Sequence, residues 1–271
     1  QHYAEMIAEV GGLITIFNAT VYPSTFPEIP AVVHWAKDNI RSVQGVVFIT
    51  YRIAATDNQM ALDSSAQQVD LSRLSYSVER FDEEFVTGPE VCQAIHECLP
   101  EYEPSGYLGG TLRHDSFKWI IGAVVGSQGG VYGAVGKPTM EVAQAGHHLW
   151  RGTYLAYLNQ PRIGAKVFLM SPWDRSVRRA ARNWLAAVVR DPGRLFDSPR
   201  LQSYAIIQAP DIQPDGRADM CDSCPDMTFY NGTLINSCRM DEYRLFGGPL
   251  SLVDRARVAA ATESPSHPAD A

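Results

Sequence analysis

The segment Cys221–Cys238 reads CDSCPDMTFYNGTLINSC and holds three of the chain's five cysteines, spaced C-x2-C-x13-C. Residues 227–236 within it read as two short strands separated by Asn231-Gly232. Asn-Gly is the strongest two-residue hairpin signal, because a type I′ turn requires positive φ at both central positions. Folding the chain about this turn brings Cys238 back toward Cys224. The sequence therefore predicts that the three sulfurs converge on one small hairpin.

Converging cysteines point to a metal site rather than to a secreted disulfide framework, and we expect a cytoplasmic protein. A structural zinc site has four protein ligands, so zinc would need one ligand beyond the three cysteines. An aspartate could supply it, or one of Cys92, Cys98, His147 and His148. A [4Fe–4S] cluster is normally held by four cysteines, and three would leave one iron open. The three thiols favour an iron–sulfur cluster, with zinc or unligated structural thiols as alternatives. The predicted metal ligands are Cys221, Cys224 and Cys238.

The N-terminal part of the chain has the pattern of one parallel βα unit. Residues 13–21 and 46–50 read as buried strands, and residues 27–39 between them read as a helix. Parallel strands need cover on both faces and further neighbours, so this unit cannot stand alone. We expect domains at 1–53 and 78–261, a polar linker at 54–77 and a disordered tail at 262–271.

The larger predicted domain alternates helical and strand-like runs. Glycine-flanked runs at 118–125 and 131–135 are expected to pair, and residues 173–190 form an amphipathic helix that carries several arginines. The other predicted helices are 3–10, 90–99, 139–158 and a weak 251–261, and the other predicted strands are 166–170 and 204–208.

Composition excludes some functions. A net charge of −7 gives no basic face broad enough to predict nucleic-acid binding. No run of eighteen apolar residues predicts a membrane span. The chain begins Gln1-His2-Tyr3 without an initiator Met, and we interpret it as part of a longer protein.

The cysteine spacing resembles that of the auxiliary cluster in the GTP 3′,8-cyclases of molybdopterin synthesis, which are radical SAM enzymes. The opening ITIFNATVYPSTFPEIPAVVHWAKDNIRSVQGVVFITYR resembles the fourth strand, helix and fifth strand of the radical SAM barrel. The stretches KWIIGAVVG, VYGAVGKPTMEVAQAGHHLWRGTYLAYL, YAIIQAPDIQPDGRADMCDSCPDM and INSCRMDEY are similar to the C-terminal half of bacterial radical SAM proteins. The resemblance covers residues 10–52 and 105–246.

This resemblance implies an α/β fold: the C-terminal part of a partial (β/α) radical SAM barrel, followed by an α+β auxiliary-cluster domain with a cysteine-bearing hairpin. It implies an auxiliary [4Fe–4S] cluster, and S-adenosylmethionine for the full-length protein. The C-x3-C-x2-C motif that holds the SAM-cleaving cluster is missing from this sequence. We therefore expect the chain to bind its cluster but to be inactive alone.

Two residues at the ends of the predicted strands are candidate ligand contacts, because α/β barrels bind ligands at this edge. Asn18 would face S-adenosylmethionine according to the resemblance, or serve as a turn residue. Arg52 could bind a carboxylate or phosphate, or form a surface salt bridge.

The remaining candidate site residues are less strongly indicated as ligands or catalytic groups. Of His147 and His148, one is expected to be buried beside Trp150. Asp226 could line the open side of a cluster, whereas neighbours such as His114-Asp115 point to opposite faces of a strand and are a poor acid/base pair.

Two functional hypotheses remain. In the first, the auxiliary cluster positions an unknown small-molecule or peptide substrate for chemistry by a 5′-deoxyadenosyl radical. In the second, the chain is a non-catalytic zinc or iron–sulfur module with a structural or electron-transfer role. No motif identifies a substrate, a macromolecular partner or an oligomeric state.

Overall fold

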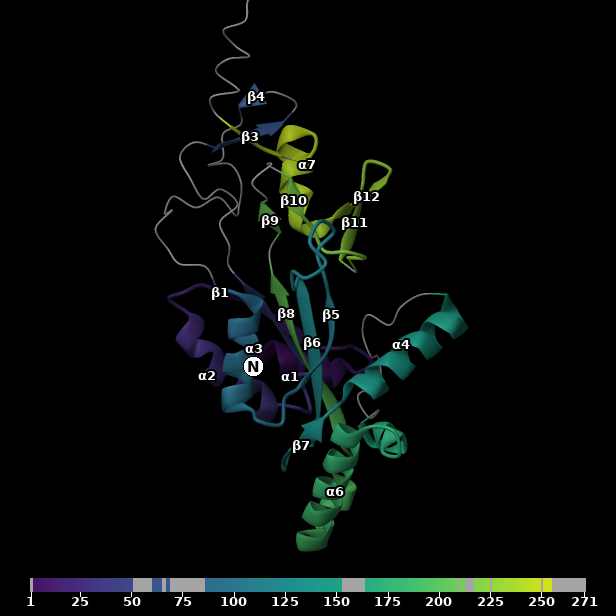
Figure 1. Ribbon diagram of the computed structural model, residues 1–271. Helices are drawn as coiled ribbons and strands as arrows, with labels where there is room; N and C mark the ends of the chain where they lie inside the picture. Colours follow the sequence, from purple (N-terminus) through teal and green to yellow (C-terminus); the bar gives the residue numbers. More distant parts are fainter. Residues whose placement is uncertain are drawn as a thin grey trace, which may run out of the picture. The chain divides into compact units, whose positions relative to one another are not determined.

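The computed structural model describes residues 2–50, 60–64, 67–68, 86–152, 164–208, 210–212, 217–224, 226–249 and 251–254 (Figure 1). The chain divides into two compact units. The sheet unit comprises Gln1–Tyr51, Val86–Gly109 and Ser116–Gln208. The cysteine unit comprises Arg52–Phe85, Gly110–Asp115 and Ala209–Ala271.

A six-stranded mixed sheet forms the centre of the sheet unit. Its order is β1-β2-β8-β6-β5, and β7 also pairs with β6. Strands β1, β2 and β8 are parallel, whereas β6 is antiparallel to β8, β5 and β7. The strands are β1 Ile16–Val21, β2 Gly45–Thr50, β5 Pro104–Leu108, β6 Trp119–Ser127, β7 Gly130–Ala134 and β8 Arg200–Gln208.

Helices cover the two faces of this sheet through separate apolar cores. Val124 of β6 belongs to the first core and Val125 to the second, because successive side chains of a strand point to opposite faces. The first core packs α2 and α3 on the sheet, and the second packs α6 on it. The helices are α1 His2–Val10, η1 Phe26–Glu28, α2 Ile29–Asp38, α3 Gly88–Cys98, α4 Lys137–Arg151, α5 Gly164–Val167, η3 Phe168–Met170, α6 Arg175–Arg190 and η4 Pro192–Phe196.

Local sequence explains where these helices begin. At α3, the Thr87 side chain accepts from the Glu90 backbone N–H while the Glu90 carboxylate accepts from the Thr87 N–H, which is a capping box. At α6, the Asp174 carboxylate accepts from the N–H groups of Ser176 and Val177. Both caps satisfy backbone donors that the first turn of a helix leaves without intrahelical partners.

The cysteine unit is built from short elements. A three-stranded sheet has the order β13-β3-β4, and two further pairs of strands are antiparallel. The elements are β3 Met60–Ser64, β4 Gln67–Gln68, β9 Asp211–Ile212, β10 Ala218–Asp219, β11 Met227–Tyr230, β12 Thr233–Asn236, η5 Ser237–Arg239, α7 Met240–Phe246 and β13 Ser251–Asp254.

The structure confirms the predicted mixed α/β class and the N-terminal βα unit, in which Phe17 of β1 lies in parallel register with Val46 of β2. The division into units differs from the predicted one. Strands β1 and β2 from residues 1–53 share one sheet with strands from 78–261, and β3 and β4 lie within the predicted linker 54–77. The predicted tail at 262–271 lies outside the described residues.

Two predicted elements were wrong. Residues 166–170 were expected to form a strand but lie in α5 and η3, with Val167 and Phe168 packed against the second core. A five-residue apolar run has too short a pattern to separate strand from helix, and its packing decides. Residues 251–254 of the predicted terminal helix form β13, because pairing with β3 overrides a weak helical preference.

One predicted strand is less buried than expected. β1 begins at Ile16 rather than at residue 13, and only Val21 among its residues is buried. It is the last strand in the described order of the sheet, so β2 is its only described neighbour. Separately, no helix in the described residues is both long and apolar enough to cross a membrane.

Candidate functional site

The predicted hairpin is confirmed. Tyr230 pairs with Thr233, so the turn contains only Asn231 and Gly232, with φ values of 46° and 84°. Positive φ at both positions is what a type I′ turn requires. Pairing continues beyond the strands, because the Ser237 N–H donates to the Asp226 carbonyl over 3.1 Å. The hairpin therefore returns the chain to the segment that carries Cys224.

The first two cysteines contact each other. Cys221 is buried, Cys224 is half-buried, and the Cys221 thiol donates a hydrogen bond to the Cys224 sulfur. This bond is the main reason that the pKa of Cys224 falls from 9.0 to about 6. Hydrogen bonds from the Asp226 backbone and the Asn236 side chain lower that pKa further. Cys224 therefore has the character of a thiolate near neutral pH.

The third cysteine lies within electrostatic reach of the second. Cys238 is in η5, at the end of the hairpin, and is exposed at the surface. Although the residue as a whole is exposed, neighbouring protein atoms desolvate its thiol, and this desolvation, followed by the charge of Cys224, raises the pKa of Cys238 to about 11. Cys224 is therefore hydrogen-bonded to Cys221 and lies within electrostatic range of Cys238.

This approach is not yet a complete ligand set. Within the described ranges, no three His, Cys, Asp or Glu side chains are grouped as they would be around a metal ion. The five cysteines are present as thiols, none of them in a disulfide. Metal binding deprotonates thiols and draws ligands together, so a metal-free site can be looser than a loaded one.

A buried carboxylate holds the chain that leads into Cys221. The Asp219 side chain is fully buried, and its Oδ1 accepts from the N–H groups of Leu112 and Arg113 at 2.7 and 3.2 Å. Gly110 forms a β-bridge with Cys221, and a Cβ at Gly110 would overlap the Asp219 carboxylate. We call residues 110–113 with Asp219 the carboxylate clamp; it fixes the backbone on one side of the cysteines.

A second polar contact follows Cys238. Arg239 and Glu242 form an ion pair in which the guanidinium lies 2.6 Å from the carboxylate, with side chains only 14% and 8% exposed. The pair joins η5 to the first turn of α7. Cys238 is thus followed at once by an anchored residue.

Sequence reasoning missed both supports. In the sequence, Asp219 is one of several aspartates near the cysteines, and no motif connects residues 110–113 with them. The available signal was Gly109-Gly110, since paired glycines often mark a close backbone approach. No local pattern identifies the segment that approaches these glycines.

The other predicted site residues do not belong to the hairpin. Asn18 is exposed on β1, and Arg52 lies outside the described residues. Cys92 and Cys98 belong to α3 in the sheet unit, where they pack against the first core, as their helix-face interpretation predicted. Burial raises the pKa of both thiols.

The expectation for the histidines was wrong. Trp150 is 83% exposed on α4, His148 is exposed and His147 is half-buried, so neither histidine is buried beside the indole. The only buried residue of α4 is Thr139, near its N-terminus, because the rest of this helix extends from the sheet unit. Elsewhere, Asp115 is exposed and pairs with Arg113, and Asp226 is exposed beside Cys224.

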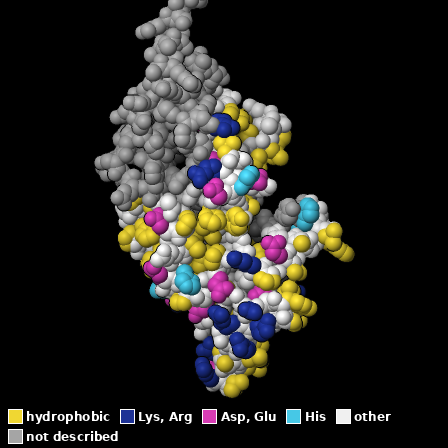
Figure 2. Space-filling view, viewed as in Figure 1, with side chains coloured by type: hydrophobic (Ala, Val, Ile, Leu, Met, Phe, Trp, Pro, Cys, Tyr) yellow, Lys and Arg dark blue, Asp and Glu magenta, His cyan; other side chains and the backbone are white. Residues whose placement is uncertain are grey.

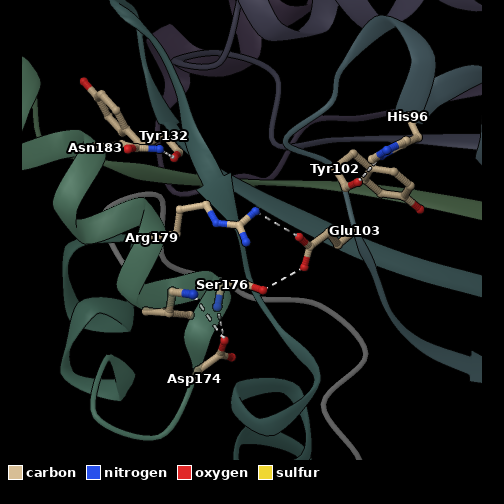
Figure 3. A network of polar contacts seen from close by, with 9 residues as sticks. His96, Tyr102, Glu103, Tyr132, Asp174, Ser176, Arg179 and Asn183 are labelled. Atoms are coloured by element: carbon tan, nitrogen blue, oxygen red, sulfur yellow. Dashed lines mark hydrogen bonds and ion pairs between the residues drawn. The ribbon is translucent and has the colours of Figure 1, made fainter.

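A pocket in the sheet unit is a second candidate. Among its lining residues, Glu103 accepts from the Ser176 hydroxyl at 2.7 Å and lies 3.7 Å from Arg179 (Figure 3). The Asn183 amide donates to the Tyr132 carbonyl over 2.8 Å, at the edge of β7. The contacts of Ser176 and Arg179 fix α6 to Glu103 before β5, and the Asn183 bond fixes it to β7, so we assign the pocket a structural role.

Comparison with known proteins gives no identification. No protein-family model matches this sequence, and no curated protein matches it. The function must therefore be argued from the site.

Proposed function

We propose that the chain binds an iron–sulfur cluster through Cys221, Cys224 and Cys238. The observation that supports this most is the return of Cys238 to the electrostatic neighbourhood of Cys224, which is itself hydrogen-bonded to Cys221. Soft thiolates select iron–sulfur clusters or zinc over hard cations. With only three thiols nearby, a [4Fe–4S] cluster fits the set with one iron left open.

The residues around the thiols suit this role. A thiol must lose its proton to become a ligand, and the pKa of Cys224 already favours the thiolate. The carboxylate clamp holds the backbone before Cys221, and the ion pair of Arg239 with Glu242 anchors the backbone after Cys238. When bound, the open iron of such a cluster can ligate and orient a substrate.

We further propose that this cluster is the auxiliary cluster of a radical SAM enzyme. The parallel β1–α2–β2 unit is compatible with part of a radical SAM barrel, and Asn18 on β1 is the candidate contact to S-adenosylmethionine. The sequence has no C-x3-C-x2-C motif. On this proposal, the three cysteines hold the auxiliary cluster and do not themselves supply the site that cleaves S-adenosylmethionine.

Anaerobic reconstitution with iron and sulfide tests the cluster. We expect a brown protein with about four irons and four sulfides per chain. Cys221→Ala, Cys224→Ala and Cys238→Ala should each lose most of the iron and the visible absorption. Cys98→Ala is the matched control, since this thiol lies on α3 in the sheet unit and should leave the iron content unchanged.

Other outcomes would overturn the proposal. Tight binding of one zinc per chain without iron uptake would favour the non-catalytic zinc module. Equal loss of iron in the Cys98→Ala control would show that the iron is bound non-specifically.

A further inference from the structure

Helix α6 differs in charge from the rest of the chain. The chain has a net charge of −7, yet Arg175–Arg190 contains five arginines and no acidic residue. The acid that precedes it, Asp174, is buried and accepts from the Thr139 hydroxyl at 2.6 Å as well as capping the helix. Figure 2 shows the Lys and Arg side chains gathered over α6.

The apolar face of α6 is already used. Val177 and Ala180 are fully buried, and Trp184 and Ala187 pack against the second core. The arginines lie on the other side of the helix, because positions 175, 178, 179 and 182 follow the i, i+3, i+4, i+7 spacing of one face. The apolar face therefore holds the helix on the sheet, and Arg179 is the residue of the outward face that adds an ion pair, to Glu103.

Few of these positive charges are compensated within the sheet unit. Among the described residues, Arg178 donates to the neutral carbonyls of Ser171 and Pro172, and Arg179 has a partly exposed partner in Glu103. No acidic side chain in the described parts of the chain pairs with the remaining three arginines of the helix. These are Arg175, Arg182 and Arg190, all exposed.

Large apolar side chains lie on the same surface, toward the C-terminal end of α6. Leu185 and Val189 are exposed on α6, and Phe196 is 93% exposed on η4, which packs against α6. Aromatic side chains and arginines are both enriched in protein–protein interfaces, so Phe196 beside the arginines has the composition of one, and Leu185 and Val189 extend its apolar area.

We infer that α6 and η4 form a docking surface for an acidic protein segment that carries carboxylates followed by an apolar anchor. Arginine binds carboxylates bidentately, and the exposed arginines supply the complementary charge. A membrane-surface helix would turn its apolar face outward, whereas that face of α6 is buried. Contacts to nucleic-acid phosphates would make no use of Val189 and Phe196.

The probe is a fluorescein-labelled synthetic peptide with a run of glutamates followed by Leu and Phe, and its anisotropy is titrated with the full chain. The variant Arg175→Gln/Arg182→Gln/Arg190→Gln should weaken binding by about tenfold, since each exposed ion pair contributes modestly. Phe196→Ser should weaken binding by about threefold and leave its salt dependence unchanged.

Two controls separate a defined surface from general charge. Arg113→Gln/Arg151→Gln/Arg244→Gln removes the same number of exposed arginines elsewhere and should leave the affinity within about twofold. Circular dichroism should show that all variants keep the helical content of the parent chain.

The proposal fails if the peptide does not bind or if both triple variants weaken binding equally. It also fails if a single-stranded oligonucleotide or a phosphatidylserine vesicle binds more tightly than the peptide and depends on the same three arginines. The supporting result is that the parent chain binds the peptide, that the Arg175/Arg182/Arg190 variant and Phe196→Ser both weaken this binding, and that the control triple variant leaves it unchanged.

Discussion

The sheet unit and the cysteine unit are stabilised in different ways. In the sheet unit, buried aliphatic and aromatic side chains such as Phe48 and Tyr204 fill two cores. In the described part of the cysteine unit, the buried apolar side chains are Ile235 and Cys221. Two carboxylates are also buried there, those of Asp219 and Glu242. The stability of the sheet unit therefore depends on buried apolar area, whereas that of the cysteine unit depends on specific polar contacts and, in our proposal, on a bound cluster.

The same substitution in both units gives the largest test of this difference. Phe48→Ala should lower the free energy of unfolding by about 3–5 kcal/mol, because Phe48 is 1% exposed and its loss leaves a cavity in a packed core. Phe229→Ala, in the hairpin, should change it by no more than about 0.5 kcal/mol, since that ring is 71% exposed. Urea unfolding followed by far-ultraviolet circular dichroism measures both. Equal costs would show that the hairpin depends on apolar contacts after all.

The carboxylate clamp gives a smaller, local effect. Asp219→Ala removes an acceptor from two backbone N–H groups and should cost about 1.5–3 kcal/mol of local stability, as charged hydrogen bonds do. Hydrogen exchange at the amides of Leu112 and Arg113 should quicken accordingly. Asp115→Ala is the control in the same loop, where an exposed ion pair contributes little. Unchanged exchange in Asp219→Ala would mean that the clamp does not order the loop.

The two units also differ in how far the sequence predicted them. Strong local signals succeeded. Asn231-Gly232 predicted the hairpin and its register, and apolar residues at helical spacing predicted most helices. Local signals failed where a distant partner decides, as at residues 251–254, which pair with β3. The carboxylate clamp could not be predicted from the sequence for the same reason, because more than one hundred residues separate Asp219 from Leu112.

Within the site, sequence reasoning identified the three cysteines but not their different chemistry. Nothing in the spacing C-x2-C-x13-C distinguishes a low-pKa thiol from a high-pKa one. That distinction arises from burial, from the thiol of Cys221 and from the charge of Cys224, which depend on the folded hairpin.

The smallest predicted effect is a difference between the two units in the pH at which a cysteine thiol titrates. In metal-free protein, the pKa of Cys224 is lowered to about 6, mainly by the hydrogen bond from Cys221, whereas burial raises the pKa of Cys98. Alkylation of Cys224 by iodoacetamide should therefore rise with a midpoint near pH 6, and that of Cys98 above pH 9. Mass spectrometry of the labelled peptides measures both profiles in one sample.

The sign of the linked stability follows from the same shift. Because folding lowers the pKa of Cys224 from 9.0 to about 6, the unfolded chain binds more protons between these values, and the folded hairpin gains stability as pH rises. This contribution is complete above about pH 9 and is lost as pH falls through about 6. Cys221→Ala should move the alkylation midpoint of Cys224 upward and flatten this dependence, since the donor is gone. A midpoint for Cys224 that stays near pH 6 in this variant would show that the two thiols do not interact and would remove the closest link in the proposed ligand set.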